Sequence, residues 1–155
     1  MRKAILRRTY IADLEGTIEM PLMNWTDKLS VGVAVIDDDH KKLVGMVNEL
    51  YDAMQSGRGK DSLGRILDGL VQYTKFHFAR EEKFFAQTAY PAAVPHKQEH
   101  DALTRQVLDV QQKYAAGATA TLSPDVLHFL RDWLIKHIQG SDQKYRPHLN
   151  AKGIH

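Results

Sequence analysis

The stretch DDDHKKLVGMVNELYDAM, residues 37–54, decides the fold of this chain. Its apolar side chains recur at intervals of three, four and seven residues, which is the spacing of one buried face of an α-helix. These residues are Leu43, Val44, Val47, Leu50, Tyr51 and Met54. His40 falls on the same face. The stretch therefore predicts an amphipathic helix that carries a histidine in its buried stripe.

Three further stretches, residues 63–85, 96–114 and 126–137, repeat this spacing. The breaks between them contain residues that end or begin helices: Gly57-Arg58-Gly59, Pro91 and Pro95, Gly117, and Ser123-Pro124. Nothing in the pattern alternates as a strand would. Four amphipathic helices with short links predict an all-α fold, an antiparallel up-down-up-down four-helix bundle.

Composition narrows the function classes. The chain has 155 residues and no cysteine, which excludes disulfides, thiolate-bound zinc, iron–sulfur clusters and a cysteine nucleophile. The formal charge is only +2, without a dense basic stripe, so we expect no nucleic-acid partner. No apolar run has the length of a membrane span and no secretory signal is visible, so we expect no membrane insertion and a cytoplasmic location. We also expect a monomer.

The chain divides into three parts. Residues 1–24 are predicted to be an N-terminal extension of unknown order, with a short helix near residues 5–14. Residues 25–148 are the expected bundle, and residues 149–155 are a polar C-terminal tail.

Seven polar residues fall on the buried faces at matching depth. His40, His77 and His100 each lie about 18 residues from a helix-linking turn, which places them roughly 25–30 Å from the turns at about 1.5 Å per residue. The full set is His40, His77, Glu81, His96, His100, His137 and Asp142. Asp142 follows His137 by a step that leaves an ideal helix face, so we expect a distortion near Gly140 to turn its carboxylate inward.

This set of side chains is expensive to bury without a metal. Seven protein ligands are too many for one tetrahedral zinc ion. With a bridging oxide or hydroxide, five imidazoles and two bridging carboxylates supply all but one of the bonds that two six-coordinate ions need, and this donor set suits iron. One coordination position would stay open for an outside ligand.

The motifs IDDDH (36–40), HFAREE (77–82), HKQEH (96–100) and His137 … Asp142 resemble those of bacteriohemerythrins, in the hemerythrin family. The resemblance covers residues 25–145. It implies one iron ion on His96, His100 and His137, and a second on His40 and His77. Glu81 and Asp142 would bridge the two ions beside an oxo or hydroxo group. Trp133, Leu134 and Ile138 would line the oxygen pocket.

The function that the resemblance implies is reversible dioxygen binding at a non-haem di-iron centre, with dioxygen held as hydroperoxide on one iron. Such a protein stores oxygen or delivers it to an oxygen-consuming enzyme, and is not itself an enzyme. The alternative is a di-iron redox enzyme, or a sensor of dioxygen or nitric oxide, that uses the same site. Repair or iron delivery also stays open.

Other polar residues receive structural interpretations. Asp37, Asp38 and Asp39 favour a helix N-terminus. Asp39 stands where the family usually has Gln and adds negative charge near His40, and Phe85 stands where Met is common. Glu82 is expected to be solvated, and Trp25 to pack the N-terminal loop onto the bundle. No ligand role is assigned to three further histidines, His128, His148 and His155.

Overall fold

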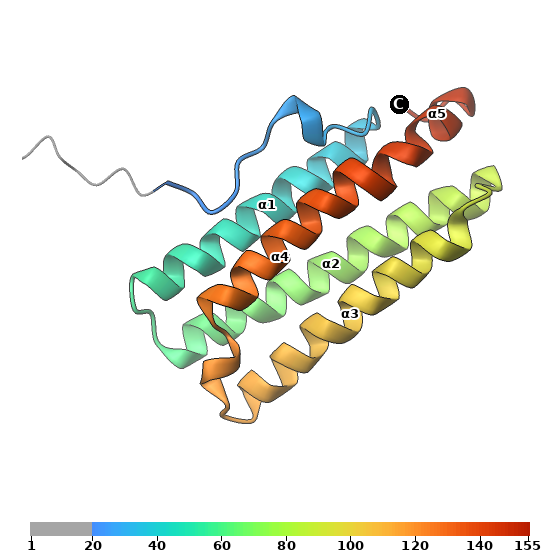
Figure 1. The fold of residues 1–155 in the computed structure, drawn as a ribbon. Coiled ribbons are helices and arrows are strands. Elements are labelled where there is room, and N and C mark those ends of the chain that lie inside the picture. The colour runs from blue at the N-terminus through green and yellow to red at the C-terminus, as the bar shows by residue number, and fades with distance from the viewer. Residues whose placement is uncertain (1–19) are drawn as a thin grey trace, which may run out of the picture.

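A computed structural model describes residues 20–155. Four long helices run antiparallel, each reversing the direction of the one before it, and no strand occurs within this range (Figure 1). Helix α1 packs against α2 and α4, and α2 packs against α3. The expected four-helix bundle is confirmed, with helices α1 (Ala34–Gln55), α2 (Lys60–Thr88), α3 (Ala93–Ala115) and α4 (Pro124–His137).

The turns form where the sequence predicted them. Gly57, between α1 and α2, adopts a positive φ of 67°, and Gly117, after α3, one of 102°. Both conformations are costly for residues with a side chain. Before α4, the Ser123 hydroxyl accepts a hydrogen bond from the Val126 N–H at 3.3 Å, and Pro124 occupies the first helical position. These residues determine where the helices end and begin at the α1–α2 and α3–α4 turns.

Helix α1 begins three residues before the predicted start at Asp37. The Asp37 carboxylate lies inside the first turns and reaches back to accept hydrogen bonds from the Val31 N–H (2.8 Å) and the Ser30 hydroxyl (2.6 Å). An acidic side chain is favourable there because the helix N-terminus is electropositive. Asp37 therefore anchors the preceding loop as well as the helix.

Part of the N-terminal extension packs on the bundle. Met23 is buried, and its backbone exchanges two hydrogen bonds with the Asn48 side chain of α1, at 2.9 and 2.8 Å. Trp25 packs against the core, as expected. The short helix predicted near residues 5–14 lies outside the described residues.

Helix α4 ends at His137, as predicted, but the chain stays helical beyond it. A π-helical turn, η3 (Ile138–Asp142), leads into helix α5 (Gln143–Ala151). The distortion expected near Gly140 is therefore present. Residue 149, where a polar tail was expected to start, belongs to α5. Leu149 is fully buried and, together with Tyr145 one turn earlier, packs α5 onto the bundle.

The buried interior differs between the two ends of the bundle. The half that carries the α1–α2 and α3–α4 turns is mainly aliphatic, whereas the half next to α5 holds the buried histidines and carboxylates. In residues 20–155 no helix combines the length and the apolarity needed to cross a membrane.

Candidate metal centre

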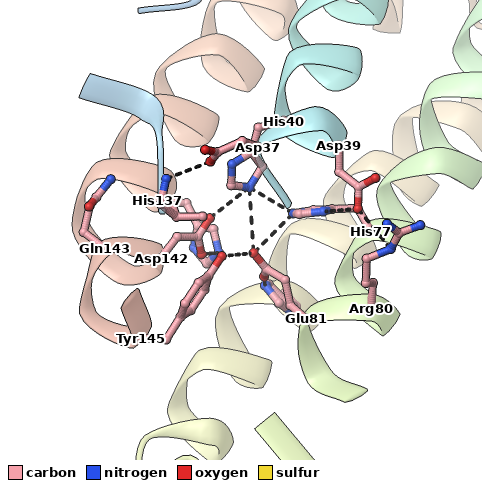
Figure 2. Close-up of polar contacts among 12 residues, drawn as sticks. Asp37, Asp39, His40, His77, Arg80, Glu81, His137, Asp142, Gln143 and Tyr145 are labelled. Atoms are coloured by element: carbon pink, nitrogen blue, oxygen red, sulfur yellow. Dashed lines mark hydrogen bonds and ion pairs between the residues drawn. The ribbon is translucent and has the colours of Figure 1, made fainter. Parts of the chain in front are cut away.

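The structure brings the seven predicted polar side chains together at the α5 end of the bundle. Figure 2 shows five of them, His40, His77, Glu81, His137 and Asp142. Each of the four helices contributes at least one histidine, α2 adds Glu81, and the π-helical turn adds Asp142. None of the seven is more than 4% exposed. Such a cluster is among the most expensive that a protein interior can hold unless its charges and lone pairs are matched.

The seven residues fall into two overlapping sets. One set joins His96, His100 and His137 to the two carboxylates, and the other joins His40 and His77 to the same two carboxylates. Within each set the ligand atoms lie within 4.8 Å of one another. Glu81 and Asp142 belong to both sets, so each is placed to bridge two ions.

Distances show how the carboxylates stand between the histidines. Asp142 Oδ1 lies 3.0 Å from Nε2 of both His96 and His137, while Oδ2 lies 3.2 Å from His40 Nε2. Glu81 is shared in the same way, with Oε2 3.0 Å from His100 Nε2 and Oε1 3.4 Å from His77 Nε2. Each carboxylate therefore turns one oxygen to each set.

Several of these buried atoms have no hydrogen-bond partner. They are His40 Nδ1, Glu81 Oε2, the Nε2 atoms of His96, His100 and His137, and both oxygens of Asp142. Buried polar atoms almost always have a partner, so a cluster of unsatisfied atoms needs an explanation. A cation satisfies lone pairs that converge on one point. The donor set present here fits a pair of metal ions.

The π-helical turn explains how Asp142 joins the cluster. Five residues separate it from His137, and in an α-helix that step turns a side chain by about 140° away from the first. The wider π turn brings both residues to the same side, and Asp142 Oδ1 lies 3.0 Å from His137 Nε2. Such turns occur often at functional sites.

Three of the five histidines are oriented by a carboxylate on a neighbouring helix. The Nδ1 atoms of His77, His100 and His137 lie 3.2, 3.0 and 2.7 Å from carboxylate oxygens of Asp39, Glu82 and Glu99, respectively. A histidine that donates its Nδ1 proton keeps the Nε2 lone pair free to bind a metal. These contacts therefore hold each ring in the orientation that a ligand needs.

One expectation about these carboxylates was wrong. Glu82 is not a fully solvated side chain, because the α2–α3 packing brings His100 within hydrogen-bond distance of it. Asp39, which was expected to add negative charge near His40, directly contacts the His77 ring of α2. Glu99 drew no attention in the sequence, although its position next to His100 was a usable signal.

Asp39 is held by three side chains of α2. Besides His77, it accepts a hydrogen bond from the Tyr73 hydroxyl at 2.8 Å. It also lies 3.3 Å from Arg80 Nε (Figure 2). Burial alone would raise the pKa of Asp39, but these contacts outweigh it and lower that pKa. The carboxylate is thus kept charged beside the His77 ring.

The electrostatics of the centre favour positive charge. Burial opposes protonation of His77, but attraction to Glu81 and hydrogen bonds to Asp39 and Glu81 raise its pKa to about 10. The same balance, with Asp142 and Glu81 as partners, raises the pKa of His96 to about 9. The pKa values of Glu81 and Asp142 are lowered despite their burial, mainly by nearby histidines. Bound cations would exploit the same negative potential.

Aromatic rings and one hydroxyl enclose the centre. The Tyr145 hydroxyl of α5 donates to Glu81 Oε1 at 2.6 Å, a contact that sequence reasoning did not identify. Phe78 stacks on His100 with ring centroids 3.8 Å apart, and Phe85 contacts the His96 ring edge-on at 4.8 Å. These contacts exclude water from the histidines.

The comparisons with known proteins agree with this architecture. The hemerythrin HHE cation binding domain matches residues 31–149. The chain belongs to the hemerythrin family. It is 38% identical to a bacteriohemerythrin of Methylococcus capsulatus over 133 residues, which cover 85% of this chain and all of the relative. A bacteriohemerythrin of Stenotrophomonas maltophilia is 34% identical over 85% of this chain and 84% of its own length.

Solved hemerythrin structures share the fold. A crystal structure described as wild-type hemerythrin superposes with a TM-score of 0.78 at 38% identity, covering 83% of this chain and 98% of the other. At this identity the likeness extends beyond the general bundle shape, and the buried cluster stands out as a candidate metal site of a hemerythrin-family chain.

The three residues that the resemblance assigns to an oxygen pocket lie around His137. Trp133 stacks on the His137 ring, with centroids 4.5 Å apart. Ile138 is fully buried in η3. Leu134 lines a large apolar cavity in the other half of the bundle, a cavity that the other two residues do not line.

Proposed function

We propose that this chain holds two iron ions with the seven clustered side chains and binds dioxygen reversibly. The observation that carries the proposal is the group of buried, unsatisfied nitrogen and oxygen atoms at the centre of the cluster. In this assignment His96, His100 and His137 hold one ion, His40 and His77 hold the other, and Glu81 and Asp142 bridge them with an oxo or hydroxo group.

The donor set supports iron and reversible chemistry. Imidazole and carboxylate ligands suit iron, and five neutral imidazoles against two carboxylates favour the ferrous state. The iron ions would supply the electrons that dioxygen takes up on binding and returns on release. Bacteriohemerythrin is the name that the relatives in Methylococcus and Stenotrophomonas carry.

The protein side chains have three tasks in this proposal. His40 and His77 provide fewer donors than the opposite set, which leaves a position for dioxygen on their side. Asp39 keeps the His77 ring oriented through its Nδ1 proton. Phe78 and Phe85 keep water from the centre, and exclusion of water slows the loss of reduced oxygen species.

The first experiment is an iron determination on the purified chain, followed by optical spectra through cycles of deoxygenation and re-aeration. We expect two irons per chain and a charge-transfer band that disappears and returns. Two irons that oxidise rapidly and irreversibly would favour a redox enzyme or sensor instead. A chain that holds zinc, or no metal, would contradict the assignment.

His77→Ala tests the side of the site that is proposed to take dioxygen. The substitution removes one of two histidines from that set, so we expect reversible oxygen binding to be lost while the far-ultraviolet circular dichroism stays helical. His128→Ala is the matched control, since this histidine lies against Tyr51 outside the cluster, with ring centroids 6.2 Å apart. Unchanged oxygen binding by His77→Ala would refute the proposed site.

Oxygen storage, or delivery to an oxygen-consuming enzyme, is the physiological role that we propose for a monomeric carrier. Both roles rest on reversibility, so the re-aeration cycles test them first.

A further inference from the structure

A cavity of about 450 Å³ occupies the half of the bundle away from the candidate metal centre. Aliphatic side chains from all four helices line it, and its lining extends to Phe78 and Leu134. Its exposed lining residues are Gln106 and Asp109 of α3 and Asp125 and Phe129 of α4. The mouth of the cavity therefore lies between α3 and α4.

The size and shape of the cavity suit a chain-like molecule. On α2 its lining runs from Leu67 to Phe78, which corresponds to about 16 Å of helix. Its volume falls in the range of sites that hold small organic ligands. Dioxygen alone would occupy a small fraction of it. Because apolar cavities stay dry and take up apolar molecules, an elongated hydrocarbon matches the interior.

The mouth determines which end group the molecule can carry. The charged side chains that line the cavity are two acids, Asp109 and Asp125, and no lysine or arginine lines it. Asp109 pairs with Lys113 Nζ at 2.7 Å, while Asp125 lies in the first turn of α4. A carboxylate end group would meet these acids without a cation of the lining to receive it. A hydroxyl can donate to them or to the Gln106 amide oxygen.

We propose that this cavity binds one linear hydrocarbon molecule with an uncharged polar end, such as a long-chain alcohol. The apolar chain lies along α2 and the polar end at the mouth between α3 and α4. None of the seven metal-centre residues lines the cavity, so the proposal stands independently of dioxygen binding. The deep end reaches Phe78, whose ring stacks on His100.

Displacement of the neutral fluorophore N-phenylnaphthylamine from the purified full chain tests this site. We expect decanol to displace the fluorophore saturably at one molecule per chain. Decanoate at pH 7 should bind about tenfold more weakly, because its charge meets the acidic mouth. Equal affinities for the two compounds would overturn the end-group assignment, and the absence of saturable decanol binding would overturn the site.

Variants on α3 locate the binding. Val110, half-buried at the mouth, lines the cavity, so Val110→Trp should fill it and reduce decanol binding at least about tenfold. Gln112→Trp adds the same ring at an exposed position of α3 that does not line the cavity, and should bind decanol normally. If Val110→Trp loses its helical signal, Val126→Phe fills the mouth from α4 and serves instead. A folded cavity-filling variant that binds like the original chain would refute the proposal.

Discussion

The same four helices enclose an apolar cavity in one half of the bundle and a cluster of histidines and carboxylates in the other. On α2 the buried face continues without a break from Leu67 and Leu70 to His77 and Glu81. In the first half it meets aliphatic neighbours and leaves a cavity, and in the second it meets four other histidines and Asp142. Helical periodicity sets which side chains point inward. The residue types along that face decide whether the interior holds an apolar molecule or metal ions.

The largest expected effect concerns pH and distinguishes the polar half from the aliphatic one. Without metal, His77 and His96 have folded-state pKa values of about 10 and about 9, against 6.5 for the free side chain. Between 6.5 and these values the folded chain binds more protons than the unfolded chain, so stability falls as pH rises. The stabilising contribution is complete below pH 6.5 and lost by about pH 10.

Urea unfolding of the metal-free chain at several pH values measures this slope. Bound metal reverses the dependence, because the ligands must be neutral imidazoles, so the stabilisation by metal should increase over the same pH interval. His77→Gln removes one of the histidines whose pKa is raised in the fold and should flatten the slope. A metal-free chain equally stable from pH 6.5 to 10 would show that the histidines are not charged in the fold.

A smaller effect tests the aliphatic half. Leu127 is fully buried and does not line the cavity, whereas Leu130, one turn later, does. We expect Leu127→Ala to cost about 2–5 kcal/mol of unfolding free energy, and Leu130→Ala to cost less, since part of its surroundings is already empty. Denaturant unfolding without added ligand compares the two. Equal losses would mean that protein side chains fill the cavity in solution.

The sequence was sufficient for the fold and for the convergence of the seven side chains. Spacings of three and four residues define each buried face, and turn residues such as Gly57 and Ser123 define the helix lengths. Counting from the turns then gives the depth of each histidine. Even the distortion before Asp142 was predictable, because a buried carboxylate five residues after His137 cannot face inward from a regular helix.

What the sequence did not reveal depends on contacts between helices. The polar composition of α5 and its Pro147 gave no sign of a packed helix, which is held by the burial of Tyr145 and Leu149 and by hydrogen bonds such as that from Asn150 to the Gly32 carbonyl. Whether a carboxylate is solvated or meets a histidine depends on how the neighbouring helix is rotated, which no single helix encodes. Glu82 is the clearest example, since it is one residue from Glu81 yet contacts His100.

The three carboxylates that orient histidines follow one pattern around the bundle. Asp39 precedes His40 on α1 and serves His77 on α2; Glu82 follows Glu81 on α2 and serves His100 on α3. Glu99 precedes His100 on α3 and serves His137 on α4. A step of one residue turns a side chain by about 100°, from the core toward the adjoining helix. An acid next to a core ligand is therefore well placed to orient the ligand of the next helix.

The smallest expected effects come from neutralising these acids, and their ranking tests what strengthens such a contact. We expect Asp39→Asn, Glu82→Gln and Glu99→Gln to weaken metal retention against a competing chelator by about 10–100-fold. The loss should be largest for Asp39, which is 5% exposed, and smallest for Glu99, which is 47% exposed, because solvent screens the latter.

The distances rank the contacts in the opposite order, from 3.2 Å for Asp39 to 2.7 Å for Glu99. A greater loss for Glu99→Gln would therefore mean that hydrogen-bond length, not burial, governs the support of the ligand. Asp38→Asn is the matched control, since this side chain is 77% exposed and pairs only with Lys41 at 3.7 Å. If it lowers metal retention as much as Asp39→Asn, the effect is one of overall charge, and the rule of neighbouring acids fails.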